Sequence, residues 1–114
     1  METTKDDHYY IQKIIDEIEL VCSYSNNMSI DDLTNRPAEF DGIVFRLIQA
    51  AEHAERISRS FKENHQEINW INLKGFRNRL VHDYGSVDLS YVYKAIKVDA
   101  PQLKETLIMV LKEK

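Results

Sequence analysis

The sequence predicts an all-α protein, an up-and-down antiparallel bundle of about five helices that forms one domain over residues 1–114. The chain contains only three glycines and two prolines, too few for the many turns of a β fold. Apolar residues instead recur every three or four positions, the spacing that places them on one face of a helix. The segments between these apolar stripes are short, and short connections favour antiparallel neighbours.

The first two helices are predicted from apolar stripes on either side of a polar segment. Isoleucine and valine recur at helical spacing between residues 11 and 22, and a second stripe runs from Ile43 to Phe61. Between the stripes, Ser29 is placed to cap a short turn of helix, and Pro37 suits the first position of the second long helix. We therefore expect one long helix on each side of this connection.

The last three helices are predicted from similar patterns. Gly75 lies inside the third helix, where glycine is unfavourable, and this predicts a close approach of another helix or of a partner's backbone. Gly85 is placed to stop this helix, and Asp88 is placed to cap the fourth. Asp99 is placed to cap the last helix, with Pro101 in its first turn. The apolar stripe of the third helix consists of Leu73, Phe76 and Leu80.

The composition limits the classes of function. A formal net charge of −4 argues against a broad nucleic-acid-binding surface, which would be basic, but leaves room for a small basic pocket. The single cysteine, Cys22, cannot form an internal disulfide, and the histidines show no metal-ligand spacing. No apolar segment resembles a signal peptide or reaches the length of a membrane span. We therefore expect a cytoplasmic protein without membrane contact or bound metal.

The segment RNRLVHDY, residues 77–84, places unusual polar side chains on the third helix. Arg77 falls near the centre of the apolar stripe, so its charge must be paired, reach outward or line a cavity. Asn78 and His82 are four residues apart and lie on one side of a helix. Arg77 and His82 are five residues apart, about 140° around the axis. Either the helix distorts before Gly85, or a second copy of the chain completes the site.

The residue types in this segment suit cleavage of an RNA phosphodiester. An imidazole such as His82 can take the proton of a ribose 2′-hydroxyl, and a guanidinium such as that of Arg77 can hold the phosphate by two contacts. Asn78 is suited to orienting the histidine or binding the substrate. The window from Lys74 to His82 contains basic residues and no acid. Spacing alone nevertheless favours the plainer interpretation, a surface cation near a hydrogen-bonded histidine.

Two longer segments resemble a known family. The segment NWINLKGFRNRLVHDYGSVDLSYVYKAI (69–96) contains an R-x4-H-x-Y signature and is similar almost throughout to the HepT-like proteins of the HEPN superfamily, formerly a domain of unknown function. The segment DGIVFRLIQAAEHAERIS (41–58) resembles the second helix of that family. Ala51 and His53 stand where the family has glycine and alanine, so packing there is expected to differ. The residues that match the family in this helix are Asp41, Arg46 and Glu52.

The resemblance implies a homodimer in which the arginine and histidine of both chains line a cleft. It implies a metal-independent endoribonuclease that cleaves RNA through attack of the 2′-hydroxyl. Arg77 and His82 are then catalytic, and Asn78 supports them. The resemblance further implies the toxin of a type VII-like toxin–antitoxin pair, with no cofactor of its own.

The resemblance also implies a switch that acts on Tyr84. The family's antitoxin is a minimal nucleotidyltransferase that uses ATP to transfer AMP onto the motif tyrosine, AMPylation of Tyr84 in this chain. The added phosphate and base would occupy the anion site of Arg77 and exclude RNA by charge and volume. The plainer interpretation of Tyr84 is a core-edge tyrosine with its hydroxyl in water.

Two further expectations concern partners inside and outside the chain. We expect Glu52 and Arg46 to pair with site residues, with Arg77 as the first candidate, because a buried charge needs a counterion. A second class of function is a non-catalytic subunit that binds a nucleotide and docks the nucleotidyltransferase, which the acidic net charge suits. Toxicity of the protein expressed alone is expected only of the ribonuclease.

Overall fold

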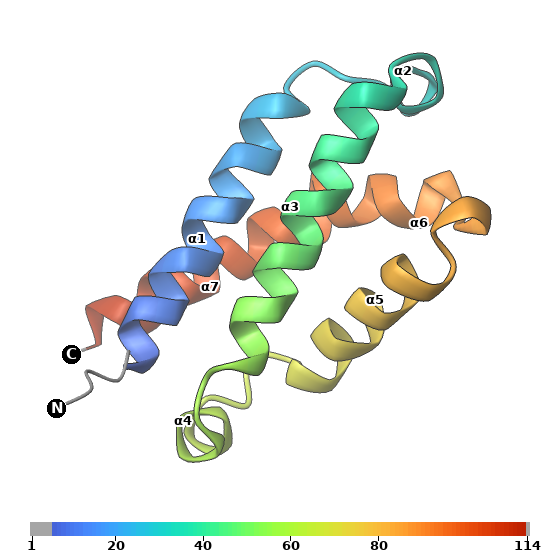
Figure 1. Cartoon of the computed structure of the whole chain (residues 1–114). Helices are drawn as coiled ribbons and strands as arrows, with labels where there is room; N and C mark the ends of the chain where they lie inside the picture. The colour runs from blue at the N-terminus through green and yellow to red at the C-terminus, as the bar shows by residue number, and fades with distance from the viewer. Residues whose placement is uncertain (1–5, 114) are drawn as a thin grey trace, which may run out of the picture.

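The computed structural model describes residues 6–113, which are helical and contain no strand (Figure 1). The long helices are α1 (Asp7–Tyr24), α3 (Pro37–Glu55), α5 (Trp70–His82) and α7 (Ala100–Lys112). The connections contain the short helices α2 (Ile30–Asn35), α4 (Arg59–Asn64) and α6 (Leu89–Lys94), a 3-10 turn η1 (Tyr84–Ser86) and a π-helical turn η2 (Ala95–Asp99). The predicted all-α class is confirmed, and Pro37 opens α3 as expected.

The long helices pack around the pair formed by α1 and α3. Figure 1 shows α1 and α3 side by side and antiparallel, with α7 passing across α1. Helix α5 lies at the edge of the bundle, antiparallel to α3. Its closest packing partner is α3, so the motif helix is held mainly from one side.

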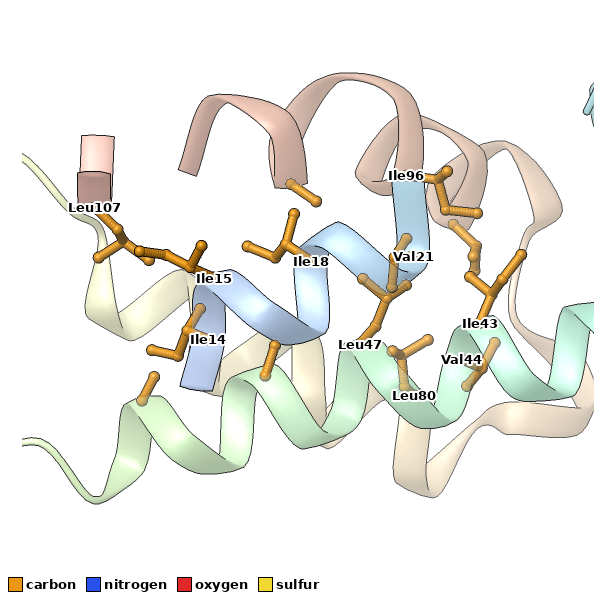
Figure 2. Close-up of a cluster of buried hydrophobic side chains, with 14 of the residues drawn as sticks. Ile14, Ile15, Ile18, Val21, Ile43, Val44, Leu47, Leu80, Ile96 and Leu107 are labelled. Atoms are coloured by element: carbon orange, nitrogen blue, oxygen red, sulfur yellow. The ribbon is translucent and has the colours of Figure 1, made fainter. Parts of the chain in front are cut away.

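The hydrophobic core lies between α1, α3 and the C-terminal helices (Figure 2). Residues at three- and four-residue spacing on α1 are at most 3% exposed, because this spacing turns them all toward α3 and α7. Complete burial of each such side chain contributes about 2 kcal/mol. The buried side chains of α1 are Ile11, Ile14, Ile15, Ile18 and Val21. Those that face them include Ile43, Val44, Leu47, Leu80, Ile96 and Leu107.

The second long helix ends earlier than the sequence predicts. Its apolar stripe was expected to continue to Phe61, but α3 ends at Glu55 and a separate helix, α4, follows. The Ser58 hydroxyl caps α4 by accepting from the Phe61 amide at 3.2 Å. The Asp7 carboxylate accepts from both the amide and the hydroxyl of Ser58, at 2.8 and 2.7 Å. A contact across 51 residues of sequence therefore sets this break.

The last helix, α7, begins directly after Asp99 with Pro101 in its first turn, as predicted, but the predicted side-chain cap is not formed. Asp99 has helical dihedral angles and makes no cap, and its carboxylate instead accepts from Lys94 Nζ at 3.3 Å. The helix continues from α6 into α7 through η2, where the Ala100 amide donates to the Ala95 carbonyl five residues earlier. Pro101 follows at once and has no amide hydrogen, so the widened turn carries the helix past the residue that would otherwise interrupt it.

The other predicted caps have mixed outcomes. Ser29 forms a capping box with Asp32, and the Ser29 backbone amide that donates to this carboxylate lowers the pKa of Asp32. Asp88 accepts from the Ser90 amide at 2.9 Å and caps α6 as expected. Gly85 does not stop α5, because the helix already ends at His82 and no described glycine has a positive φ.

Candidate active site

Helix α5 presents the motif residues on a regular backbone. Asn69 caps its start by accepting from the Asn72 amide at 3.0 Å, and the Trp70 indole donates to the His65 carbonyl at 3.1 Å. The helix then continues without interruption to His82. Arg77 and His82 therefore project about 140° apart around one axis. Of the two alternatives that the spacing leaves open, a distortion between them is excluded.

Arg77 is anchored by an acid from the neighbouring helix. Its Nε donates to Glu52 Oε2 at 2.9 Å, and its Nη2 lies 2.7 Å from the same oxygen. Its Nη1 donates to Asn78 Oδ1 at 2.9 Å. Both side chains of the ion pair are about one third exposed, so the pair is formed without full desolvation. The predicted pairing of Glu52 with Arg77 is confirmed.

These bonds leave part of the guanidinium available. Of its five N–H donors, three are directed at Glu52 and Asn78, which leaves one on each terminal nitrogen of Arg77. Beside it lies a small pocket of about 230 Å³. Two donors fixed at the edge of a pocket can bind an anion of phosphate geometry. The pocket is lined by Glu52, Glu55, Lys74, Arg77 and Asn78.

The basic window of the sequence is largely neutralised by its neighbours. Lys74 Nζ lies 4.0 Å from a Glu55 carboxylate oxygen, and Arg79 lies over the ring of Tyr91 at 4.2 Å. With Arg77 paired to Glu52, every lysine and arginine of this window has a partner. A free basic patch is therefore absent from this part of the described structure, and anion binding depends on the spare donors of Arg77.

Arg46 does not pair with the site, contrary to expectation. It lies six residues before Glu52 on α3, about 120° around the helix, and so faces α1 instead. Its Nη1 donates to Glu17 at 3.2 Å, and His53 Nε2 lies 3.7 Å from the other Glu17 oxygen. Burial lowers the pKa of His53 below its ordinary value, and outweighs the opposite effect of Glu17. These residues connect α1 to α3 and have no contact with the motif.

His82 is exposed and has no polar partner in the described part of the chain. It is the last residue of α5, and its side chain makes no hydrogen bond or ion pair with any of residues 6–113. Asn78 lies one turn earlier on the same side, but its carbonyl oxygen accepts from Arg77. The expected orientation of His82 by Asn78 is therefore not observed, and the imidazole is free to meet a substrate.

Tyr84 contacts the first turns of α3. Its hydroxyl donates to the Asp41 carboxylate, and its ring stacks on Phe40 with centroids 6.1 Å apart and planes 17° apart. The residue as a whole is 40% exposed. The plainer expectation of a hydroxyl in water missed this contact. Two features of the sequence could have predicted the contact: the match of Asp41 to the family and the spacing of Asp41 from Glu52.

Other sequence features lie away from this site. Cys22 is half-buried at the edge of the core and is free. Within residues 6–113, no group of three or more His, Cys, Asp or Glu side chains is placed to hold a metal ion. None of the helices in that range is long and apolar enough to cross a membrane.

The fold and the site together define an all-α protein that places an arginine and a histidine on one helix and a tyrosine directly after it. A family model described as ribonuclease HepT-like matches residues 14–110. The chain belongs to the ribonuclease HepT-like family.

Individual relatives agree with this assignment. The probable ribonuclease HepT of Thermococcus cleftensis is 30% identical over 96 residues, which cover 83% of this chain and 86% of the relative. A Caldanaerobacter subterraneus protein provisionally named as an RNase is 23% identical over 104 residues, which cover 91% of this chain and 93% of the relative.

A Methanocaldococcus jannaschii protein named γ-glutamylcyclotransferase and, provisionally, RNase is 28% identical over 109 residues. This match covers 96% of the chain but only 49% of the relative, so the chain spans about half of that protein. No solved structure matches the chain.

Proposed function

We propose that this protein is a metal-independent endoribonuclease in which Arg77 and His82 are catalytic and Asn78 is supporting. The observation that carries the proposal is that one regular helix holds a bonded arginine and an unbonded histidine. Arg77 is fixed by Glu52 and Asn78 with two donors to spare, whereas His82 is exposed and unengaged. A fixed guanidinium that binds the phosphate and an imidazole that transfers protons can together catalyse RNA cleavage.

The proposed reaction follows from these groups. His82 takes the proton of the ribose 2′-hydroxyl as its oxygen attacks the adjacent phosphorus. The bond from the 2′-oxygen to phosphorus forms and the bond to the 5′-oxygen breaks, and the His82 imidazolium returns its proton to the leaving 5′-oxygen. The spare N–H groups of Arg77 stabilise the negative charge that grows on the phosphoryl oxygens. The products are a 2′,3′-cyclic phosphate and a 5′-hydroxyl end.

Homodimerisation is part of the proposal, because Arg77 and His82 diverge on a helix that does not bend. Ile71, Gly75, Asn78 and His82 recur at the spacing of a single stripe along α5. Ile71 is 83% exposed, and a Cβ placed on Gly75 would meet nothing within 4 Å. The close approach expected at Gly75 is therefore absent within the described chain, which leaves the partner's backbone as the candidate.

An apolar groove extends this candidate interface. It has a volume of about 820 Å³ and lies between α5 and the segment from α6 to α7. A second copy that covered α5 would bury Ile71 and bring a second Arg77 and His82 to the same place by two-fold symmetry. Residues that line the groove include Leu73, Gly75, Phe76, Tyr91 and Leu103.

A mixing experiment tests both the chemistry and the dimer. Arg77→Ala and His82→Ala are each expected to abolish cleavage of a labelled RNA. Coexpression of the two variants is expected to restore about a quarter of wild-type activity, because half the dimers are mixed and each mixed dimer has one intact composite site. His8→Ala, a change of a histidine outside the motif, is the control. Undiminished cleavage by His82→Ala would refute the catalytic assignment.

We further propose that the protein is the toxin of a toxin–antitoxin pair, in which a partner minimal nucleotidyltransferase transfers AMP from ATP onto Tyr84. The Tyr84 oxygen forms a bond to the α-phosphorus of ATP in place of its proton, and pyrophosphate leaves. The family assignment and the 40% exposure of Tyr84 support this. The test is intact mass of the protein expressed alone and with its genomic neighbour, together with host growth. Addition of AMP at Tyr84 should accompany the rescue of arrested growth.

A non-catalytic nucleotide- and transferase-binding subunit is the second candidate. The acidic net charge and the pairing of Lys74 and Arg77 with Glu55 and Glu52 favour it, because they leave little free positive charge for RNA. This candidate is supported if the protein alone arrests no growth and cleaves no RNA, while it still binds the transferase. Growth arrest that depends on His82 would exclude it.

A further inference from the structure

The contact between Tyr84 and Asp41 is the feature of the motif that the proposed reaction does not use. We propose that Tyr84 and Asp41 form a latch that positions the segment carrying His82, and that modification of the Tyr84 hydroxyl opens this latch. Asp41 is then a positioning residue that acts on His82 through Tyr84. The regulatory half of this inference rests on the proposed function, whereas the latch itself rests on the fold.

The first support is the register between α3 and α5. Asp41 and Glu52 are eleven residues apart on α3, about three turns, so they differ by only about 20° around the helix. The two helices are antiparallel, and Glu52 holds Arg77 while Asp41 holds Tyr84. One face of α3 therefore holds the motif at both ends, and His82 lies between the two attachments.

The second support is the shortage of other attachments near His82. Every residue of 81–86 is exposed, so no apolar side chain fixes this segment in the core. Its backbone hydrogen bonds are local: the Asp83 amide donates to the Arg79 carbonyl, and the Ser86 amide donates to the Asp83 carbonyl. The hydroxyl of Tyr84, together with its stack on Phe40, joins the segment to α3.

The third support is the chemistry of the modification. When AMP is attached, the phenolic oxygen of Tyr84 becomes an ester oxygen and has no proton to donate. The new phosphodiester carries a negative charge, which the Asp41 carboxylate repels. Both changes break the contact with Asp41. Modification would therefore displace His82 even where the nucleotide does not cover the RNA cleft.

Conservative variants separate this latch from simple blocking of the cleft. Tyr84→Phe removes the hydroxyl and keeps the ring, and Asp41→Ala removes the acceptor. Each is expected to lower kcat of RNA cleavage about tenfold, the factor that corresponds to one charge-assisted hydrogen bond, with KM changed less than about twofold. Asp41→Asn keeps an acceptor oxygen and is expected to retain most of the activity. Tyr93→Phe, which removes a hydroxyl distant from the motif, is the control.

Hydrogen exchange of the backbone amides of residues 82–87 gives a readout that does not depend on activity. Exchange is expected to be faster in Tyr84→Phe and Asp41→Ala, and close to wild type in Asp41→Asn and Tyr93→Phe. Unchanged exchange in Tyr84→Phe and Asp41→Ala would overturn the latch, whatever the activity. If exchange is faster in these two variants and the wild type itself cleaves no RNA, the latch is upheld and the ribonuclease proposal is refuted. If the two variants exchange faster but keep a normal kcat, the Tyr84–Asp41 contact does not position His82 for catalysis.

Discussion

Helices α1 and α5 differ sharply in how the chain holds them. Helix α1 buries five large apolar side chains against α3 and α7, whereas the only fully buried side chain of α5 is Leu80. Helix α5 is joined to α3 instead by polar contacts of Arg77 and Tyr84 with acids. The motif therefore stands on the long helix that its own chain covers least. Its outer surface stays uncovered, as the proposed binding of RNA and of a second copy requires.

The largest expected effect comes from the α1 side of this comparison. Ile18→Ala removes a side chain that is 1% exposed in the centre of the core. The free energy of unfolding should fall by about 2–5 kcal/mol, because the lost burial and the remaining cavity add together. Chemical denaturation followed by circular dichroism measures this change. A loss below about 1 kcal/mol would show that α1 is not the main element of the core.

A smaller effect is expected where α5 meets α3. Glu52→Gln leaves Arg77 without its counterion, and because both groups are one third exposed the loss of stability should be only about 1 kcal/mol. RNA cleavage should fall more, by about tenfold, because a mobile guanidinium no longer holds the phosphate in place. Steady-state cleavage and denaturation measure the two effects.

Glu55→Gln is the matched control for this prediction. Glu55 pairs with Lys74 at 4.0 Å, on more exposed side chains, in the same pocket. Its loss should change the free energy of unfolding by less than about 0.5 kcal/mol and leave cleavage near wild type. Equal loss of cleavage in both variants would show that the charge of the pocket matters rather than the orientation of Arg77.

The sequence could predict features that depend on local spacing, but not those that depend on contacts between distant segments. The apolar stripes, the capping residues Ser29 and Asp88 and the pairing of Glu52 with Arg77 all depend on local spacing or on the need of a buried charge for a partner. The end of α3 at Glu55 depends on Asp7, which only the folded chain brings to Ser58. Local patterns therefore predicted the elements and not all of their limits.

The contacts made by the candidate-site residues were predicted only in part. Arg46 was assigned to the site, but its partner Glu17 lies 29 residues earlier, on a face of α1 that spacing along α3 does not reveal. The contact of Tyr84 with Asp41 spans 43 residues and requires the register of α5 against α3. Such contacts appear only once two helices have been packed together.

A still smaller effect on stability is expected on the outer face of α5. Ile71→Ser replaces a side chain that is 83% exposed, so the unfolding free energy of the monomer should change by less than about 0.5 kcal/mol. If a second copy covers this face, the same change should weaken association by at least about tenfold, because a buried apolar contact is lost. Sedimentation equilibrium over a range of concentrations measures the association. Met109→Ser, at a residue 65% exposed on α7, is the control.

The smallest expected effect is a pH dependence of the α1–α3 contact. Burial lowers the pKa of His53, as do the nearby cations Arg56 and Lys13, while Glu17 acts in the opposite direction. As the pH falls below about 6.5, the unfolded chain takes up a proton at His53 before the folded chain does. Stability is therefore present in full above that pH and falls until the lower pKa of the folded chain is passed. The slope of the unfolding free energy with pH that His53 causes corresponds to less than one proton taken up on unfolding.

His53→Gln isolates this contribution, because the other histidines are common to both proteins. Denaturation midpoints of wild type and variant, measured between pH 7.5 and pH 5, should converge as the pH falls, since only the wild type loses stability at His53. A wild type that gained stability relative to His53→Gln on acidification would show that the Glu17 contact dominates instead. The α1–α3 contact would then gain a charged pair at low pH. Helix α1, like α5, would depend in part on polar contacts with α3.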